Sequence, residues 1–137
     1  MESMSFRQLQ VIEDQLKQIR EAILNLQEWN KSMSSADDFH LSPEGVKTLA
    51  ADCMLIEAIG EGFKRIDNKT NNSSLPLCPE IPWKQVIGMR DHIAHGYFDI
   101  NSEFVWDVIH NDLQPLLVAT DFLLINLFDI IPADDEK

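Results

Sequence analysis

The sequence predicts an all-α domain built as a bundle of about four long helices. Apolar residues recur at spacings of three and four over long stretches, as on amphipathic helices. Loops rich in Ser, Asn, Asp and Pro separate these stretches. The apolar/polar alternation that is typical of strands is absent. The 137 residues are enough for one domain with its own core, so we expect a single domain over residues 1–137.

The first predicted helix begins after Ser5 and runs to about Trp29. Ser5 and Gln8 have the spacing of a capping box. The apolar residues form one narrow seam: Leu9, Ile12, Leu16, Ile19, Ile23 and Leu26. Residues 30–41 are polar and rich in Ser and Asp, which predicts a loop.

A second helix is predicted from the sequence Ser42-Pro43-Glu44 to about Ile66. A hydroxyl, a proline and an acid in this order are typical of a helix start. Gly60 and Gly62 lie inside the helix although glycine costs about 1 kcal/mol there relative to alanine. We interpret them as points of close helix packing. Residues 67–80 form a predicted loop.

Two further helices complete the predicted bundle. The third begins at Pro82-Trp83 and ends near Gly96. The fourth is capped by residues 100–102 and continues to about Ile130, and Pro115 should kink or divide it. Several narrow apolar seams on a small chain indicate that some apolar surface is left for a partner subunit.

The charge of the chain is strongly acidic and unevenly distributed. There are 23 Asp and Glu against 11 Lys and Arg, a net charge of −12. From Asp99 onward there are nine acids and one base, whereas the first 98 residues carry 14 acids and ten bases. Such a surface argues against broad electrostatic binding of nucleic acid. We expect any anion-binding site to lie in the first 98 residues.

Other features exclude several classes of site. Cys53 and Cys78 belong to no Cys-x-x-Cys or Cys/His cluster, so we expect no zinc site and no cofactor. Residues 122–131, the most apolar stretch, are too short to span a bilayer. The first residues contain no apolar signal core. We therefore expect a soluble, cytoplasmic protein with reduced thiols and a flexible acidic tail at residues 133–137.

The densest group of reactive side chains is the sequence Arg90-Asp91-His92-Ile93-Ala94-His95-Gly96-Tyr97. Asp91 and His95 are four residues apart, so Asp91 can orient the His95 ring and stabilise its charged form. Arg90 and His95 point about 140° apart on a helix, so they converge only if the helix distorts or a second copy contributes. A proton-exchanging histidine and a phosphate-binding arginine suit metal-free work on a phosphodiester.

Simpler interpretations of these residues stay open. The Arg, Asp and His side chains could form a surface ion-pair network. His92 and His95 have the spacing of two metal ligands but lack a third. Tyr97 could anchor the helix end in the core, and Glu57 and Glu61 could form a solvated face.

The same sequence resembles the R-x4-H-x-Y motif of the HepT-like toxins, which belong to the HEPN (higher eukaryote and prokaryote nucleotide-binding) superfamily. The surroundings of the motif match as well. They comprise Ile81-Pro82-Trp83 at the start of the motif helix, Gly88-Met89 before the arginine, Gly60-Glu61 on the preceding helix and Val105-Trp106 after the motif. The resemblance covers nearly the whole chain in helix order and length.

The resemblance implies a four- to five-helix up-and-down bundle that forms a homodimer with the two motif helices facing each other. The implied activity is a metal-independent endoribonuclease. His95 would act as general base or acid at the ribose 2′-hydroxyl, Arg90 would hold the scissile phosphate and Asp91 would orient the catalytic groups. Tyr97 matches the tyrosine that a partner nucleotidyltransferase antitoxin modifies with AMP.

Basic residues outside the motif are candidates for RNA contacts. Lys84 precedes the motif on the same predicted helix, and Lys64, Arg65 and Lys69 are candidates for contacts with RNA or with the antitoxin. One alternative function is a non-catalytic helical module that binds nucleotide or substrate and docks on a nucleotidyltransferase. Another is a structural dimer in which the motif is vestigial.

Overall fold

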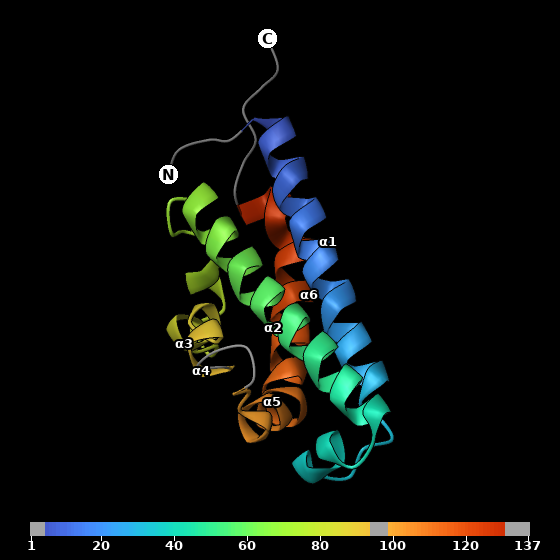
Figure 1. The fold of residues 1–137 in the computed structure, drawn as a ribbon. Coiled ribbons are helices and arrows are strands. Elements are labelled where there is room, and N and C mark those ends of the chain that lie inside the picture. The colour runs from blue at the N-terminus through green and yellow to red at the C-terminus, as the bar shows by residue number, and fades with distance from the viewer. Residues whose placement is uncertain (1–4, 94–98, 131–137) are drawn as a thin grey trace.

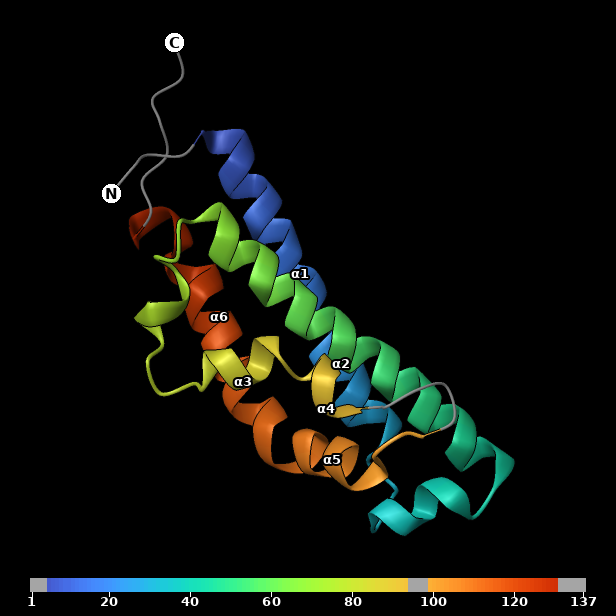
Figure 2. The ribbon, with the colours of Figure 1, turned by 60° about the vertical axis from the view of Figure 1, so that its left-hand side comes forward.

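The computed structural model describes residues 5–93 and 99–130, and the side chains of residues 5–93 and 99–127. Three long helices run side by side, α1 (Phe6–Trp29), α2 (Pro43–Lys69) and α6 (Leu113–Ile130) (Figure 1). α1 packs against the other two and runs opposite to both. The short helices α3 (Trp83–Ile87), α4 (Arg90–Ile93) and α5 (Ser102–Asp107) lie beside them (Figure 2). The described residues form helices and no strand, which confirms the all-α prediction.

The first helix agrees with its prediction at both ends. The Ser5 hydroxyl accepts a hydrogen bond from the Gln8 N–H at 3.1 Å, and the Gln8 side chain accepts one from the Ser5 N–H at 2.9 Å. This is the predicted capping box. All six residues of the predicted apolar seam are buried against α2 and α6. Each such Leu or Ile contributes roughly 1.5–3 kcal/mol through burial.

The two predicted loops contain short helical turns that the sequence analysis missed. A 3₁₀ helix spans Ala36–His40 and buries Phe39 completely. A second spans Leu75–Leu77 and buries Leu75. α2 ends at Lys69 rather than near Ile66. A single apolar residue in a polar segment gives no periodic pattern, so these turns are stabilised by contacts that only the folded chain provides.

The prediction of one continuous third helix is wrong. Its described part is α3 and α4, separated by a turn at Gly88 and Met89. At this turn the N–H groups of residues 89, 91 and 92 bond to carbonyls three residues back, which winds the chain more tightly than an α-helix. Glycine weakens a helix by about 1 kcal/mol, so the break falls at Gly88. The predicted end at Gly96 lies outside the described residues. Instead of four long helices, the described residues thus contain three.

Gly60 and Gly62 of α2 mark close packing, as predicted. An ideal Cβ at Gly60 would lie 3.0 Å from the carbonyl oxygen of Val86, so α3 approaches α2 closely at this point. An ideal Cβ at Gly62 would lie 2.9 Å from Cδ1 of Ile19 on α1. Gly60 therefore determines how near the motif-bearing segment lies to α2.

The fourth predicted helix is divided, as expected for a chain that contains Pro115. Asn101 caps the start of α5. The helix then changes to a π-helix over Val108–Asp112, in which the Leu113 N–H bonds to the Val108 carbonyl. α6 follows directly. Pro115 has no N–H for the carbonyl four residues earlier, which disfavours a regular α-helix through this segment.

Exposed apolar side chains remain on α6, as the narrow seams predicted. Val118 is 61% exposed, Phe122 41% and Ile125 77%. The partner subunit itself stays a prediction. Within residues 5–93 and 99–130, no helix combines the length and hydropathy of a membrane span. The predicted tail at residues 133–137 lies outside the described residues.

Candidate active site

Arg90 is the first residue of α4, and its side chain is exposed. It lines a groove of about 390 Å³ whose other walls come from α1 and α2. The other polar residues that line it are Gln15, Gln18, Glu57, Glu61 and Arg65. The groove therefore crosses the outer face of α2 and joins α1 to the helix that carries the motif.

The backbone that carries Arg90 is held by buried neighbours. Met89 and Ile93 are both buried, and α4 packs on α2 and α5. The Ile93 carbonyl accepts a hydrogen bond of 2.7 Å from the Asn101 N–H. The core thus fixes the helix while the guanidinium remains in the groove.

The structure describes three of the five predicted site and substrate-contact residues. Arg90 lines the groove, whereas Asp91 and Lys84 are exposed and do not line it. His95 and Tyr97 lie outside the described residues. The predicted pairing of Asp91 with His95 and the predicted roles of all five residues therefore stay predictions.

The cations of the chain fall into two groups. Those with a carboxylate partner within 4.0 Å are Lys17, Arg20, Lys31 and Lys47. The second group has no carboxylate within 4.0 Å in the described part of the chain, and it consists of Arg7 and five further Lys and Arg residues. These five, here called the cation cluster, are Lys64, Arg65, Lys69, Lys84 and Arg90. They lie on the second half of α2 and on α3 and α4, and none of them is neutralised by a direct ion pair among the described residues.

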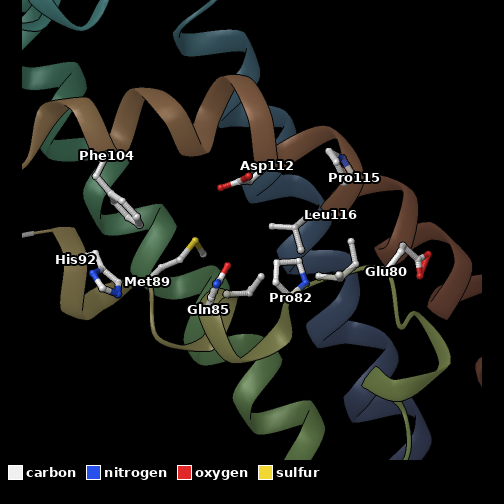
Figure 3. Close-up of a pocket in the computed structure, with 11 residues that line it drawn as sticks. Glu80, Pro82, Gln85, Met89, His92, Phe104, Asp112, Pro115 and Leu116 are labelled. Atoms are coloured by element: carbon white, nitrogen blue, oxygen red, sulfur yellow. The ribbon is translucent and has the colours of Figure 1, made fainter.

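A second cavity, of about 340 Å³, borders α4, and Arg90 is not among its lining residues (Figure 3). Met89 and His92 face it, and the His92 ring packs on Phe104 with centroids 5.5 Å apart. The Asp112 carboxylate points into it from the π-helix. Burial, together with the nearby Asp107, raises the pKa of Asp112. No Lys or Arg is among its described lining residues, so this cavity disfavours an anion.

A buried polar pair joins α1 to α2 away from the groove. Asp52 is completely buried, and its Oδ1 accepts a hydrogen bond of 2.9 Å from Asn30 Nδ2. Asp52 Oδ2 and Asn30 Oδ1 have no hydrogen-bond partner among the described residues. Burial raises the pKa of Asp52 to about 7, although the bond from Asn30 lowers it. This carboxyl group could not be predicted as buried, because Asp52 lies within an ordinary helical pattern.

The two cysteines are buried and free. Burial, with nearby carboxylates adding to it, raises the pKa of Cys53 to about 11 and also raises that of Cys78. Both thiols are therefore protonated and unreactive at neutral pH. The described side chains include no group of three His, Cys, Asp or Glu that could hold a metal ion. The alternative metal pair of His92 and His95 falls partly outside them.

Gln15 and Gln18 were not predicted as neighbours of Arg90. They lie on α1, far along the chain from the motif, and the folded structure brings them to the groove. Glutamine on the polar side of an amphipathic helix carries no functional signal by itself. Only their position relative to Arg90 could have identified them.

Comparison with known proteins gives one consistent result. The family model described as "Ribonuclease HepT-like" matches residues 12–122. A "Probable ribonuclease HepT" of Thermococcus cleftensis is 33% identical over 103 residues, which cover 75% of this chain and 86% of that relative. "Putative RNase MJ0127" of Methanocaldococcus jannaschii is 37% identical over 65 residues, or 47% of this chain and 50% of that relative. No solved structure gives a significant match.

The matched region includes the whole motif, the groove-lining parts of α1 and α2, and most of the bundle. The resemblance predicted from the motif and its surroundings is thereby confirmed. The chain belongs to the HepT-like ribonuclease family, a family of RNA-cleaving enzymes.

Proposed function

We propose that the protein is a metal-independent endoribonuclease and the toxin of a two-component toxin–antitoxin system. The observation that carries the proposal is Arg90, an exposed guanidinium that lines a groove and has no ion-pair partner among the described residues. Arginine binds a phosphate through two parallel hydrogen bonds and stabilises charge that develops in a transition state. Arg65, the second cation of the groove, and the family membership favour RNA as the substrate.

The proposed reaction uses the 2′-hydroxyl of the RNA as nucleophile, so no metal-bound water is needed. His95 as general base takes the proton from O2′, and O2′ attacks the adjacent phosphorus. The bond from phosphorus to the 5′-oxygen breaks, and a general acid protonates the leaving oxygen. The products are a 2′,3′-cyclic phosphate and a 5′-hydroxyl. Arg90 would hold the phosphate oxygens, and Asp91 would orient the histidine.

The proposed active site lies in a cleft between two copies of the chain. Arg90 and His95 are five residues apart, so on one regular helix they point about 140° away from each other. With the motif helices of two copies facing each other, Arg90 of one copy can act with the histidine of the other. The second histidine then also provides the general acid. The exposed position of Arg90 on α4 supports such an arrangement.

The proposed control is transfer of AMP to Tyr97 by a cognate nucleotidyltransferase antitoxin. The Tyr97 hydroxyl oxygen would attack the α-phosphorus of ATP, lose its proton and release pyrophosphate. The resulting O-AMP-tyrosine places a bulky anion beside the motif, where it would repel and obstruct RNA. Mass spectrometry after incubation with ATP and the antitoxin should show one added AMP, and Tyr97→Phe should show none.

A cleavage assay in EDTA tests the catalytic proposal. Wild-type protein should cut RNA and leave cyclic-phosphate or 3′-phosphate ends, and His95→Ala should lose the activity while keeping its helical circular dichroism. Equal inertness of both proteins on tRNA and mRNA would mean that the catalytic proposal is wrong. If such an inert protein still bound nucleotide and docked on the nucleotidyltransferase, the non-catalytic binding module would be favoured instead.

A further inference from the structure

The groove beside Arg90 is larger than one phosphate group requires. Its volume of about 390 Å³ lies in the range of small-molecule sites. Its lining combines two guanidinium groups, two amides, two carboxylates and several apolar side chains. A site that combines cations, amides and apolar carbons matches the phosphate, base edge and base face of a nucleotide.

Arg65 is the second cation of the groove. It is exposed on α2, lines the same groove as Arg90 and has no ion-pair partner in the described part of the chain. Glu61 lies one turn earlier on the same helix, yet the two side chains form no salt bridge. Both arginines are therefore available to phosphate, and one substrate strand carries more than one phosphate.

Two amides face the groove from α1. Neither Gln15 nor Gln18 has a hydrogen-bond partner within the described residues, and Gln15 Oε1 is shielded from water as well. The exposed Gln18 amide presents a donor and an acceptor side by side, whereas Gln15 Oε1 is buried and only the amino group of that amide can bond to a ligand. The pairing on Gln18 is the one with which Asn and Gln bind the edge of a base.

Apolar side chains form another part of the groove lining. Met54 is 71% exposed, although methionine usually lies in the core, and Ala22 and Ala58 line the groove beside it. A thioether packs well against an aromatic ring, and bases stack on flat apolar surfaces irrespective of sequence. The exposed methionine therefore offers a contact for the face of a base.

We infer that this groove binds the RNA nucleotide next to the scissile phosphate, with Arg65 on its phosphate, Gln15 and Gln18 at its base edge and Met54 against its base face. The inference rests on the proposed function, since that function supplies RNA as the substrate. It adds a substrate subsite that lies outside the motif and is formed by α1 and α2.

Two carboxylates limit what the groove can take. Glu57 and Glu61 line it between the amides and the motif helix, and they repel any phosphate beyond those that the arginines hold. Their oxygens can accept hydrogen bonds from the amino groups of a base. The groove therefore suits one unpaired nucleotide of a single strand, not the continuous backbone of a duplex.

The test has two parts. Each variant is made in the otherwise wild-type protein to measure kcat and KM for RNA cleavage. The same variant is made together with His95→Ala to measure binding of a fluorescein-labelled 12-nucleotide single-stranded RNA. Arg65→Ala should weaken binding about tenfold, lower the slope of log K against log salt by about 1, and raise KM with little change in kcat. Arg65→Lys should restore part of the binding. The matched control is Arg7→Ala, an exposed cation at the start of α1 that does not line the groove, and it should change none of these values.

The amides have a separate signature. The double variant Gln15→Ala/Gln18→Ala should change the preference among oligo-A, oligo-C and oligo-U while leaving the salt slope unchanged, because amides carry no charge. Both residues lie on the polar side of α1, so the fold should persist in circular dichroism.

Three outcomes would overturn the inference. If wild-type protein cleaves RNA but the Arg65 and Gln variants keep its KM, salt slope and base preference, the subsite is wrong and the proposed function stands. If wild-type protein neither cleaves nor binds RNA, both fail. If Met54→Glu changes the oligomeric state in light scattering, and RNA binding falls only in variants whose oligomeric state has changed, the groove is an interface between copies. If wild-type protein does not cleave RNA but binds it, and the Arg65 and Gln variants weaken or alter that binding, the subsite is supported and the proposed catalytic function is not.

Discussion

The two cavities beside α4 differ in electrostatic character. The groove at Arg90 combines two carboxylates, Glu57 and Glu61, with two arginines that have no ion-pair partner in the part of the chain that the structure describes. The pocket at His92 is mainly apolar, and its described lining has two carboxylates, Glu80 and Asp112, and no Lys or Arg. A helix of four residues borders both cavities.

This difference shows how a strongly acidic protein can still recognise phosphate. The net charge of −12 describes the field at long range, whereas binding depends on which cations are left without a carboxylate partner. On the first helix, two of the three arginines and lysines, Lys17 and Arg20, form ion pairs within that helix or with α6. The cation cluster around Arg65 and Arg90 is unpaired. Local pairing, rather than total charge, therefore points to the site.

The largest expected effect is the loss of cleavage in Arg90→Ala. Removing a guanidinium that holds the scissile phosphate should lower kcat/KM by about 10²- to 10³-fold. His92→Ala, two residues further along α4, changes only the apolar pocket and should leave cleavage close to wild type. Steady-state kinetics on one RNA in EDTA compares the two variants. Similar losses in both would show that the two sides of α4 do not differ in function.

Asp52→Asn should stabilise the protein by about 2–4 kcal/mol above pH 7. The pKa of Asp52 is raised from 3.8 to about 7 in the folded state. Between these values the carboxyl ionises only in the unfolded chain, so wild-type stability falls as the pH rises from about 4 to about 7 and then levels off. An asparagine removes this loss, and its amide can donate to the unpartnered Asn30 Oδ1.

Thermal unfolding at a series of pH values measures this effect. The difference in Tm between Asp52→Asn and wild type should be near zero at pH 4 and largest above pH 7. Cleavage should keep the wild-type pH profile, because Asp52 does not line the groove. A constant difference in Tm at all pH values would contradict the raised pKa.

Gly60→Ala should destabilise the protein by about 1–3 kcal/mol, since the new Cβ would lie 3.0 Å from a backbone oxygen of α3. The shift of α3 and α4 should also lower cleavage. Gly62→Ala is the matched control, because its Cβ meets the flexible end of the Ile19 side chain. That variant should be close to neutral in chemical denaturation. Equal destabilisation by both would mean that α3 does not depend on Gly60.

The smallest expected effect is that of Arg20→Met, which removes a paired cation. Arg20 Nε lies 2.7 Å from Asp121 Oδ1, and both side chains are about two-fifths exposed. Exposed pairs contribute about 0.2–1 kcal/mol, and less at high salt. Denaturation in low and high salt should show a small loss that shrinks with salt. RNA binding should not change, in contrast to Arg65→Ala, because this cation is already neutralised by its partner.

The long helices could be predicted from the sequence because their signals are local. The capping box at Ser5 and the apolar seam of α1 need no information from elsewhere in the chain. The break at Gly88 was not predicted, because the strong pattern from Pro82 onward concealed it. The buried turn around Phe39 was missed because one apolar residue makes no period.

The all-α class, the division of the helix that contains Pro115 and the family can be read from the chain alone, since periodicity, proline geometry and a spaced motif are properties of neighbouring residues. The groove that Gln15, Gln18 and Arg65 share with Arg90, and the burial of Asp52 beside Asn30, depend on how the helices pack. These relations join residues from different helices. Helix packing brings them together, and no pattern along the chain records which polar faces will meet.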